Sequence, residues 1–164
     1  MKIGIIIIFH NNETDIETSV FIEQLNQTKN IELCFVNNNS KDNTYQLLNE
    51  IKEGCSNVSV VNVKKFKSDV SAVRAGARFM FNKFNLKHLG YVSTNLLTTK
   101  YHGLKGLINA INENQEVILK YNIETLEKHE IKLTLFKSLF SVVEYLKKIK
   151  VENQFINLQF LSKL

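Results

Sequence analysis

The sequence predicts a single α/β domain, a three-layer α/β/α sandwich with a mostly parallel central sheet. Short apolar runs rich in β-branched residues alternate with longer segments whose apolar residues recur at helical spacing. This alternation indicates parallel strands joined by crossover helices. No proline interrupts the chain, and its 164 residues suit one domain with one core.

The predicted strands are apolar runs bounded by polar turn residues. They lie at residues 3–9, 31–36, 58–63, 90–92 and 116–121. Between them, Thr14 and Glu17 form a capping box for the first helix, Gly54 ends the second, and Ser68 caps the third. Two further amphipathic helices are predicted at residues 101–111 and 135–149. The apolar tail at residues 155–161 is interpreted as an added strand or a packing arm.

The net charge of +5 is a mild bias toward anionic ligands, without the dense basic run of a nucleic-acid-binding protein. The tightest basic cluster, Lys64, Lys65 and Lys67, is more typical of a solvated face. Cys34 lies in an apolar run, which predicts a buried free thiol. The four histidines have no metal-ligand spacing.

The apolar segment at residues 5–9 is too short for a signal-peptide core, and no run approaches the ~20 apolar residues of a membrane span. We therefore expect a cytoplasmic protein without a transmembrane segment. The amphipathic helix near residues 135–150 leaves peripheral contact with an anionic membrane open, although packing against the sheet explains its apolar stripe more simply.

Polar clusters follow three apolar strands directly, at residues 10–12, 37–40 and 93–95. Because ligands in open α/β sheets bind beyond the carboxyl ends of the strands, we expect all three clusters at one rim. Asparagine and serine also make turns and helix caps, which would explain any one cluster alone. Three in register favour a site that reads a base or a sugar by hydrogen bonds. No Walker-type, G-x-G-x-x-G or G-x-S-x-G motif occurs.

Four segments occur in a recognisable order. They are Ile-Phe-His-Asn at 8–11, Asn-Asn-Asn-Ser-Lys-Asp-Asn-Thr at 37–44, Ala-Val-Arg-Ala-Gly at 72–76 and Gly-Tyr-Val-Ser-Thr-Asn-Leu at 90–96. Their order and spacing resemble family 2 glycosyltransferases of the GT-A fold, over roughly residues 2–99. In that family the corresponding segments are Pro-x-Tyr-Asn, Asp-Asp/Asn-x-Ser-x-Asp-x-Thr, Ala-x-Arg-x-Gly and Gly-Tyr-x-Asp-x-Asp-Leu.

The resemblance implies a binding site for a nucleoside diphosphate or nucleotide-sugar. Asn37 replaces the acidic residue that helps bind the base in the family, and its amide can still hydrogen-bond a base edge. His10 replaces an aromatic residue near the base and can stack on it. Arg74 is either a phosphate ligand or a helix-surface cation. The predicted nucleotide-binding residues are His10, Asn11, Asn37, Asn38, Ser40 and Arg74.

The family's Asp-x-Asp element, which holds a divalent cation on the diphosphate, is replaced by Ser93, Thr94 and Asn95. Magnesium and manganese prefer anionic oxygen ligands, so we expect neither metal nor any other cofactor to be bound. Lys64, Lys65 and Arg74 are candidate fixed cations in its place.

The resemblance divides the single domain, residues 1–164, into a nucleotide-binding half, 1–99, and a shortened acceptor half, 100–164. No glutamate of the second half lies in a motif, so no catalytic base is assigned. Two functions stay open. One is a small transferase that moves a hexosyl group from a nucleotide-sugar, with UDP or GDP, to a saccharide or lipid acceptor. The other is an inactive relative, a pseudoenzyme that acts as a scaffold or binding module through a protein partner or as a homo-oligomer.

Overall fold

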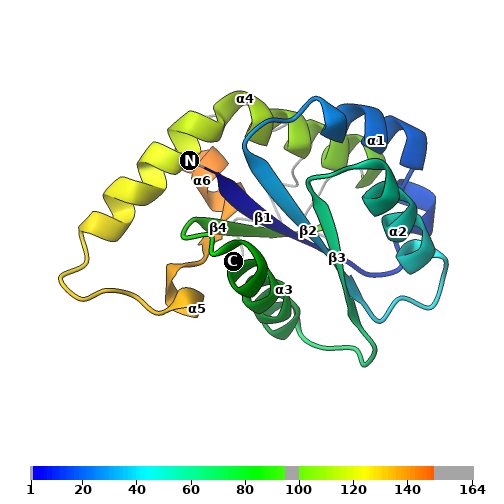
Figure 1. Ribbon diagram of the computed structural model, residues 1–164, viewed down its shortest axis with the longest axis horizontal. Coiled ribbons are helices and arrows are strands. Elements are labelled where there is room, and N and C mark those ends of the chain that lie inside the picture. The colour runs from blue at the N-terminus through cyan, green and yellow to red at the C-terminus, as the bar shows by residue number, and fades with distance from the viewer. Residues whose placement is uncertain (1, 95–99, 150–164) are drawn as a thin grey trace.

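The computed structural model describes residues 2–94 and 100–149, which form a five-stranded sheet with helices on both faces (Figure 1). The strand order is β3-β2-β1-β4-β5, and all of the strand pairs are parallel. The strands are β1 (Ile3–Phe9), β2 (Ile31–Asn38), β3 (Val58–Val63), β4 (Leu89–Ser93) and β5 (Phe140–Ser141). The predicted α/β class with a mostly parallel sheet is confirmed.

The helices divide between the two faces of the sheet. They are the 3₁₀ turn η1 (Glu13–Asp15), α1 (Thr18–Asn26), α2 (Thr44–Gly54), α3 (Asp69–Phe84), α4 (Lys100–Glu127), α5 (Leu135–Ser138) and α6 (Val142–Lys148). Helices α1, α2, α4 and α6 contribute to one hydrophobic core, and α3 with α5 packs on the other face. Figure 1 shows α4 and α1 above the sheet and α3 below it.

Strand β1 lies at the centre of the sheet, and all seven of its residues are buried. Ile5 and Ile7 point into the core under α1 and α4, whereas Ile6 and Ile8 point toward α3. A strand covered on both faces needs apolar side chains at every position, which explains the continuous isoleucine run. Residues of β1 pair with β2 on one side and β4 on the other, so the ends of these three strands share one edge.

The predicted helix at residues 135–149 is wrong, because β5 divides it into α5 and α6. Phe140 pairs with Gly90 of β4 and is buried, and its ring stacks on Tyr145 at a centroid distance of 4.4 Å. A Cβ on Gly90 would lie 2.5 Å from that ring, so the glycine makes room for it. The Ser141 hydroxyl then accepts from Glu144 N at 3.3 Å and caps α6.

Two other local predictions are also wrong. Residues 116–121 are not a strand, because α4 continues through them after a kink at Asn114. Ile118 and Asn122, four residues apart, are both buried while Val117 is 51% exposed, which is a helical pattern of burial. Thr14 and Glu17 form no capping box: a 3₁₀ turn occupies 13–15, and α1 begins at Thr18 without a side-chain cap. The tail at 155–161 lies outside the described residues.

Ser68 does cap α3, since its hydroxyl accepts from Ser71 N at 3.3 Å. Val70 and Phe81 recur at helical spacing with the buried Val73 and Ala77, which predicts one apolar stripe, yet they are 62% and 43% exposed. Cys34 is a buried free thiol as predicted, and burial raises its pKa to about 12 against a smaller opposing effect of Lys83. No helix in the described part of the chain is long and apolar enough to cross a membrane.

Helix α3 approaches the sheet closely at Gly76. A Cβ there would lie 2.7 Å from Ile6 Cγ2 and 3.0 Å from Val36 Cγ2, two side chains that are fully buried. We expect Gly76→Ala to lower the free energy of unfolding by about 1–2 kcal/mol, since overpacking outweighs the gain of about 1 kcal/mol in helix propensity. Denaturant unfolding measures this. Asn82→Ala, at an exposed position of α3, should leave stability unchanged or raise it; equal effects of both substitutions would contradict the packing argument.

A buried polar chain joins α6, α4 and the residue before β4. Tyr145 Oη donates to Asn122 Oδ1 at 2.7 Å, and Asn122 Nδ2 lies 2.7 Å from His88 Nδ1. Because the amide nitrogen donates, His88 accepts at Nδ1 and is neutral, with its proton on Nε2. Burial, helped by the charge of Lys87, holds the pKa of His88 below its usual 6.5.

This lowered pKa makes stability depend on pH. The unfolded chain takes up a proton below pH 6.5 while the folded His88 stays neutral, so stability is complete above pH 6.5 and declines as the pH falls toward the folded-state pKa. We expect His88→Asn to be less stable at pH 8 but to lose less stability between pH 6.5 and 5 than the unmodified protein. Urea unfolding across this range measures the slope. His129→Asn, at an exposed position, should keep the original slope.

Candidate functional site

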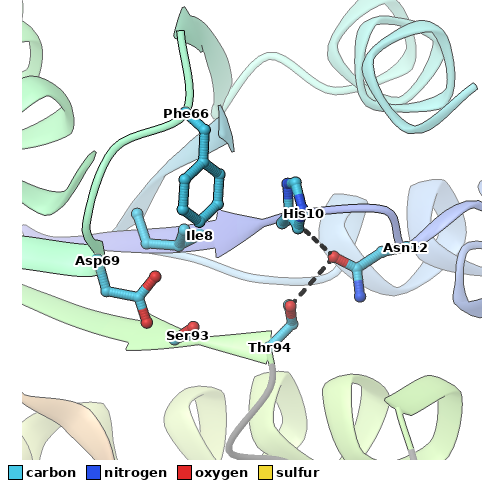
Figure 2. A pocket seen from close by; sticks show the side chains of 7 residues that line it. All are labelled: Ile8, His10, Asn12, Phe66, Asp69, Ser93 and Thr94. Atoms are coloured by element: carbon cyan, nitrogen blue, oxygen red, sulfur yellow. Dashed lines mark hydrogen bonds between the residues drawn. The ribbon is translucent and has the colours of Figure 1, made fainter. Parts of the chain in front are cut away.

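The carboxyl edge of the sheet brings the polar strand ends together, as predicted. The buried side chain of Asn12 connects two of them: its Oδ1 accepts from His10 N at 2.7 Å and from Thr94 Oγ1 at 3.1 Å (Figure 2). Its backbone N–H donates to Thr44 Oγ1 at 2.7 Å. The side chain of Asn12 thus joins the ends of β1 and β4, and its backbone N–H joins them to the start of α2.

Asn11 and Ser40 join the loops that follow β1 and β2. Asn11 N donates to Ser40 Oγ at 3.0 Å, and Asn11 Oδ1 accepts from Lys41 N at 2.8 Å. Asn11 has a left-handed backbone conformation (φ 53°), which asparagine tolerates better than most residues. Both predicted nucleotide ligands thus have a role within the loops, and both remain solvent-accessible.

Asp42 is the carboxylate of the second motif, and it organises the start of α2. Its Oδ1 accepts from Thr44 Oγ1 (2.6 Å) and Thr44 N (3.0 Å), and its Oδ2 accepts from Glu13 N (3.2 Å). Burial acts to raise the pKa of Asp42, but these hydrogen bonds outweigh it and hold the pKa below its usual 3.8. Glu13 in turn accepts from Asn43 Nδ2 at 2.9 Å. The carboxylate is therefore charged at neutral pH and committed to the protein's own N–H and O–H groups.

The loop between β3 and α3, residues 64–68, is fixed by two asparagines of the β2 end. Asn38, with no exposed surface, donates from Nδ2 to Lys67 O (2.8 Å) and accepts at Oδ1 from Lys67 N (3.0 Å). In the amide orientation that satisfies both of its partners, Asn39 donates to Lys64 O (2.9 Å) and accepts from Phe66 N (3.3 Å). These contacts hold an exposed aromatic residue, Phe66, in a defined position.

A pocket of about 130 Å³ lies between this loop and the ends of β1 and β4. Figure 2 shows the Phe66 ring directed toward Ile8 and His10 beside it. The His10 and Phe66 rings meet edge to face at a centroid distance of 4.9 Å. The lining residues are Ile8, His10, Asn12, Phe66, Asp69, Ser93 and Thr94. The pocket thus combines two accessible rings with polar groups, a combination that suits a planar polar ligand.

The hydrogen bonds of His10 define its tautomer. His10 Nδ1 lies 2.7 Å from Asn38 O, an acceptor, so Nδ1 carries the proton. Nε2 then accepts from Asn11 Nδ2, 3.1 Å away. This arrangement fixes the plane of the imidazole at the pocket.

Asn37, the other predicted base ligand, faces a second hollow of about 350 Å³ beside α2. Its Nδ2 donates to Asn62 Oδ1 of β3 at 2.9 Å, while its buried Oδ1 has no partner among the described residues. Asn37 and Asn38 point to opposite faces of the sheet, as consecutive strand residues must. They therefore do not reach the same pocket.

The remaining predicted site residues lie apart from the pocket or outside the structure. Arg74 lies on α3 with its guanidinium 5.3 Å from the centre of the Phe136 ring of α5, and it lines none of the pockets described above. Asn95 lies outside the described residues. Ser93 and Thr94 line the pocket, with the Thr94 hydroxyl donating to Asn12.

The described residues do not fit a divalent cation of the kind that the family implies. Ser93 and Thr94 offer neutral oxygens, and Asp69 is the one carboxylate that lines the pocket. Within residues 2–94 and 100–149, no three His, Cys, Asp or Glu side chains are grouped to hold a metal ion.

Three residues important to the site were not predicted as ligands. The sequence predicts Asn12 only as a residue that follows a strand, although Asn12 joins the ends of β1 and β4 to the start of α2. Phe66 lies between two lysines in a loop, and the sequence does not show that its ring is 57% exposed and held in place. Asp69 begins α3, where an acidic residue is ordinarily explained by the helix dipole.

An amide is required at position 38 because the site uses both its donor and its acceptor. We expect Asn38→Asp to lower the free energy of unfolding by about 1–3 kcal/mol at pH 7, since a carboxylate oxygen would face the Lys67 carbonyl. Below about pH 4 the protonated carboxyl regains a donor, so the deficit relative to the unmodified protein should shrink. Denaturant unfolding at both pH values measures this, and Asn82→Asp is the exposed control. A deficit that persists unchanged at low pH would contradict the explanation.

Comparisons with known proteins place the chain in a family. The model of glycosyl transferase family 2 matches residues 4–88, a little over half of the chain. A comparison with curated protein sequences found no match.

Among solved structures, the chain is similar to S. aureus TarS 1-349, with 16% identity and a TM-score of 0.45. The likeness covers 70% of this chain and 33% of that chain. TarS 1-349 in complex with UDP gives 15% identity, a TM-score of 0.45 and the same coverage. Its complex with UDP-GlcNAc gives 15% identity and a TM-score of 0.40, over 70% of this chain and 32% of that chain. This chain therefore spans about a third of the length of the TarS chain.

The family match includes the ends of β1 and β2, η1 and the whole loop that carries Phe66, and it stops just before β4. The chain belongs to glycosyl transferase family 2.

Proposed function

We propose that the chain binds the nucleoside diphosphate part of a nucleotide-sugar at the carboxyl edge of the sheet, without a divalent cation. The observation that carries the proposal is the fixed position of Phe66. An aromatic ring that is 57% exposed costs hydration free energy, yet its backbone and that of its neighbours are bonded to Asn38, which ends β2, and to Asn39, which follows it. Such a ring, with His10 beside it, is suited to stack on a base.

Hydrogen-bonding groups around these rings suit the rest of the nucleotide. Ser93 lines the pocket, and the amides of Asn11 and Asn37 and the Ser40 hydroxyl lie along the same edge. Lys64, Lys65 and Lys67, all exposed on the loop, supply positive charge near the diphosphate in place of a metal. In this proposal, Asn38 positions the loop rather than contacting the ligand, and Arg74 would have to leave Phe136 to take part.

Sugar transfer to a saccharide or lipid acceptor is the finer proposal, and an inactive binding module that acts through a protein partner is the alternative. The neutral residues at Asn37, Ser93 and Asn95 favour the alternative. Without charged metal ligands, the diphosphate leaving group lacks the electrostatic stabilisation on which such a transfer depends. Release of the nucleotide from UDP-sugars and GDP-sugars during incubation distinguishes the two, since only the transferase or hydrolase activity produces it.

Calorimetric titration with UDP, GDP and CDP, each with and without manganese, tests the proposed binding. We expect one of these nucleotides to bind equally well in the presence and absence of the metal. Phe66→Ala should weaken binding by between about fivefold and a hundredfold, since stacking of a base on an aromatic ring contributes about 1–3 kcal/mol. Phe81→Ala, which removes an exposed ring at the other end of α3, is the matched control and should not change the affinity.

The same titration can contradict the proposal in two ways. No binding of any nucleotide would overturn the nucleotide pocket itself. Binding that is strengthened by manganese, and that loses this gain in Asp69→Asn, would assign the metal to Asp69 and overturn the metal-free mode. In the double variant Ser93→Asp/Asn95→Asp, a newly acquired manganese dependence would support a pocket that lacks only its metal ligands.

A further inference from the structure

Another hollow opens at the opposite, amino-terminal edge of the sheet, where β4 begins. It has a volume of about 470 Å³, within the range of small-molecule sites, and is larger than the pocket at Phe66. Its walls come from the end of α3, the turn before β4, the end of α4 and the segment from Lys132 to Ser138. It shares no lining residue with the nucleotide pocket.

Most of this hollow is apolar. The apolar lining residues are Phe81, Leu86, Leu126, Leu133 and Leu135. Leu86 is buried at the base, Phe81 is 43% exposed, and the other three are half-buried. Accessible leucine side chains gathered in one concave site gain free energy when an apolar ligand removes them from water.

The polar groups of the hollow are positively charged or are hydrogen-bond donors. Lys87 and Lys132 are exposed at its rim, and no carboxylate lies among the described residues that line it. Lys87 is close enough to His88 to help lower the pKa of the imidazole. Two lysines without a compensating acid give this end of an otherwise apolar site a net positive charge.

His88 adds an oriented donor. The chain of hydrogen bonds from Tyr145 through Asn122 leaves the imidazole proton on Nε2, and no described protein group accepts it. The buried amide fixes the ring plane, so this N–H is already oriented in the ligand-free protein. An acceptor on a ligand would therefore meet the donor without reordering of the ring.

We propose that this hollow binds a single-chain amphipathic anion, an alkyl or acyl chain that ends in a carboxylate or a phosphate. The hydrocarbon chain lies on the leucines and Phe81. The head group accepts from His88 Nε2 and pairs with Lys87 and Lys132. A neutral chain would leave both cations and the His88 donor unmatched, and a small anion without a chain would leave the apolar lining in water.

Calorimetric titration of the full chain with monomeric decanoate and dodecyl phosphate tests this, with decanol and dodecyl maltoside as neutral ligands. We expect saturable one-to-one binding of an anion, at least tenfold tighter than either neutral ligand. Lys132→Glu should weaken anion binding about tenfold. Lys128→Glu should not, because Lys128 is an exposed lysine just after α4 that does not line the hollow. Leu133→Ser, in a segment outside the helices, should weaken it severalfold. Nucleotide affinity should be unchanged in all three variants.

Several outcomes would overturn the proposal. Equal affinity for decanol and decanoate would reduce the hollow to a non-selective apolar surface. Binding only to vesicles of phosphatidylcholine with phosphatidylglycerol, and not to monomers, would assign this face to a membrane. A concentration-dependent dimer that Leu133→Ser abolishes, measured by sedimentation, would assign it to a second copy of the chain. No saturable binding of either anion, or an equal loss in Lys128→Glu, would also exclude it.

Discussion

The candidate nucleotide site depends on one buried amide, that of Asn38. Its donor and acceptor pair with the carbonyl and the N–H of Lys67, so both backbone polar groups of one loop residue are satisfied by one side chain. Because Asn38 ends β2, which pairs with β1 and β3, the loop takes its position from the centre of the sheet. The place of Phe66, one residue before, and the start of α3 at Asp69, two residues after, both follow from this contact.

The fold could be predicted from the sequence wherever burial dictates composition. The run of isoleucines in β1 is explained by a strand covered on both faces. Such a strand is typical of a parallel sheet, so the same run also predicts the sheet type. Prediction failed where a distant residue decides the local structure. Phe140 leaves the expected helix because Gly90, fifty positions earlier, leaves space for its ring, and no local periodicity carries that information. The strand predicted at residues 116–121 is wrong because a short apolar run suits a buried helix equally well.

The edge of the site was predictable, whereas the role of each residue along it was not. Parallel strands must place their carboxyl ends together, so the positions of His10, Asn37 and Ser93 follow from topology alone. Which amides stay free for a ligand depends on contacts between loops about thirty residues apart, such as that of Asn38 with Lys67. Phe66 gains its role from the same contacts, which is why a basic loop gave no indication of an oriented ring.

The asparagine amides along this edge act in two ways. A carboxylate only accepts hydrogen bonds, whereas the amides of Asn11, Asn12 and Asn38 both donate and accept. They therefore bond the three strand ends directly to one another, and the edge is ordered without an ion. At position 37, an amide in place of the family's carboxylate also removes a negative charge that would repel a diphosphate or require a cation between the two. In the proposed function, such an edge supplies the shape and hydrogen bonds for holding a nucleotide, and the loop lysines take the place of a metal. Sugar transfer would further need charge that stabilises the departing diphosphate, so binding and catalysis would depend on different side chains.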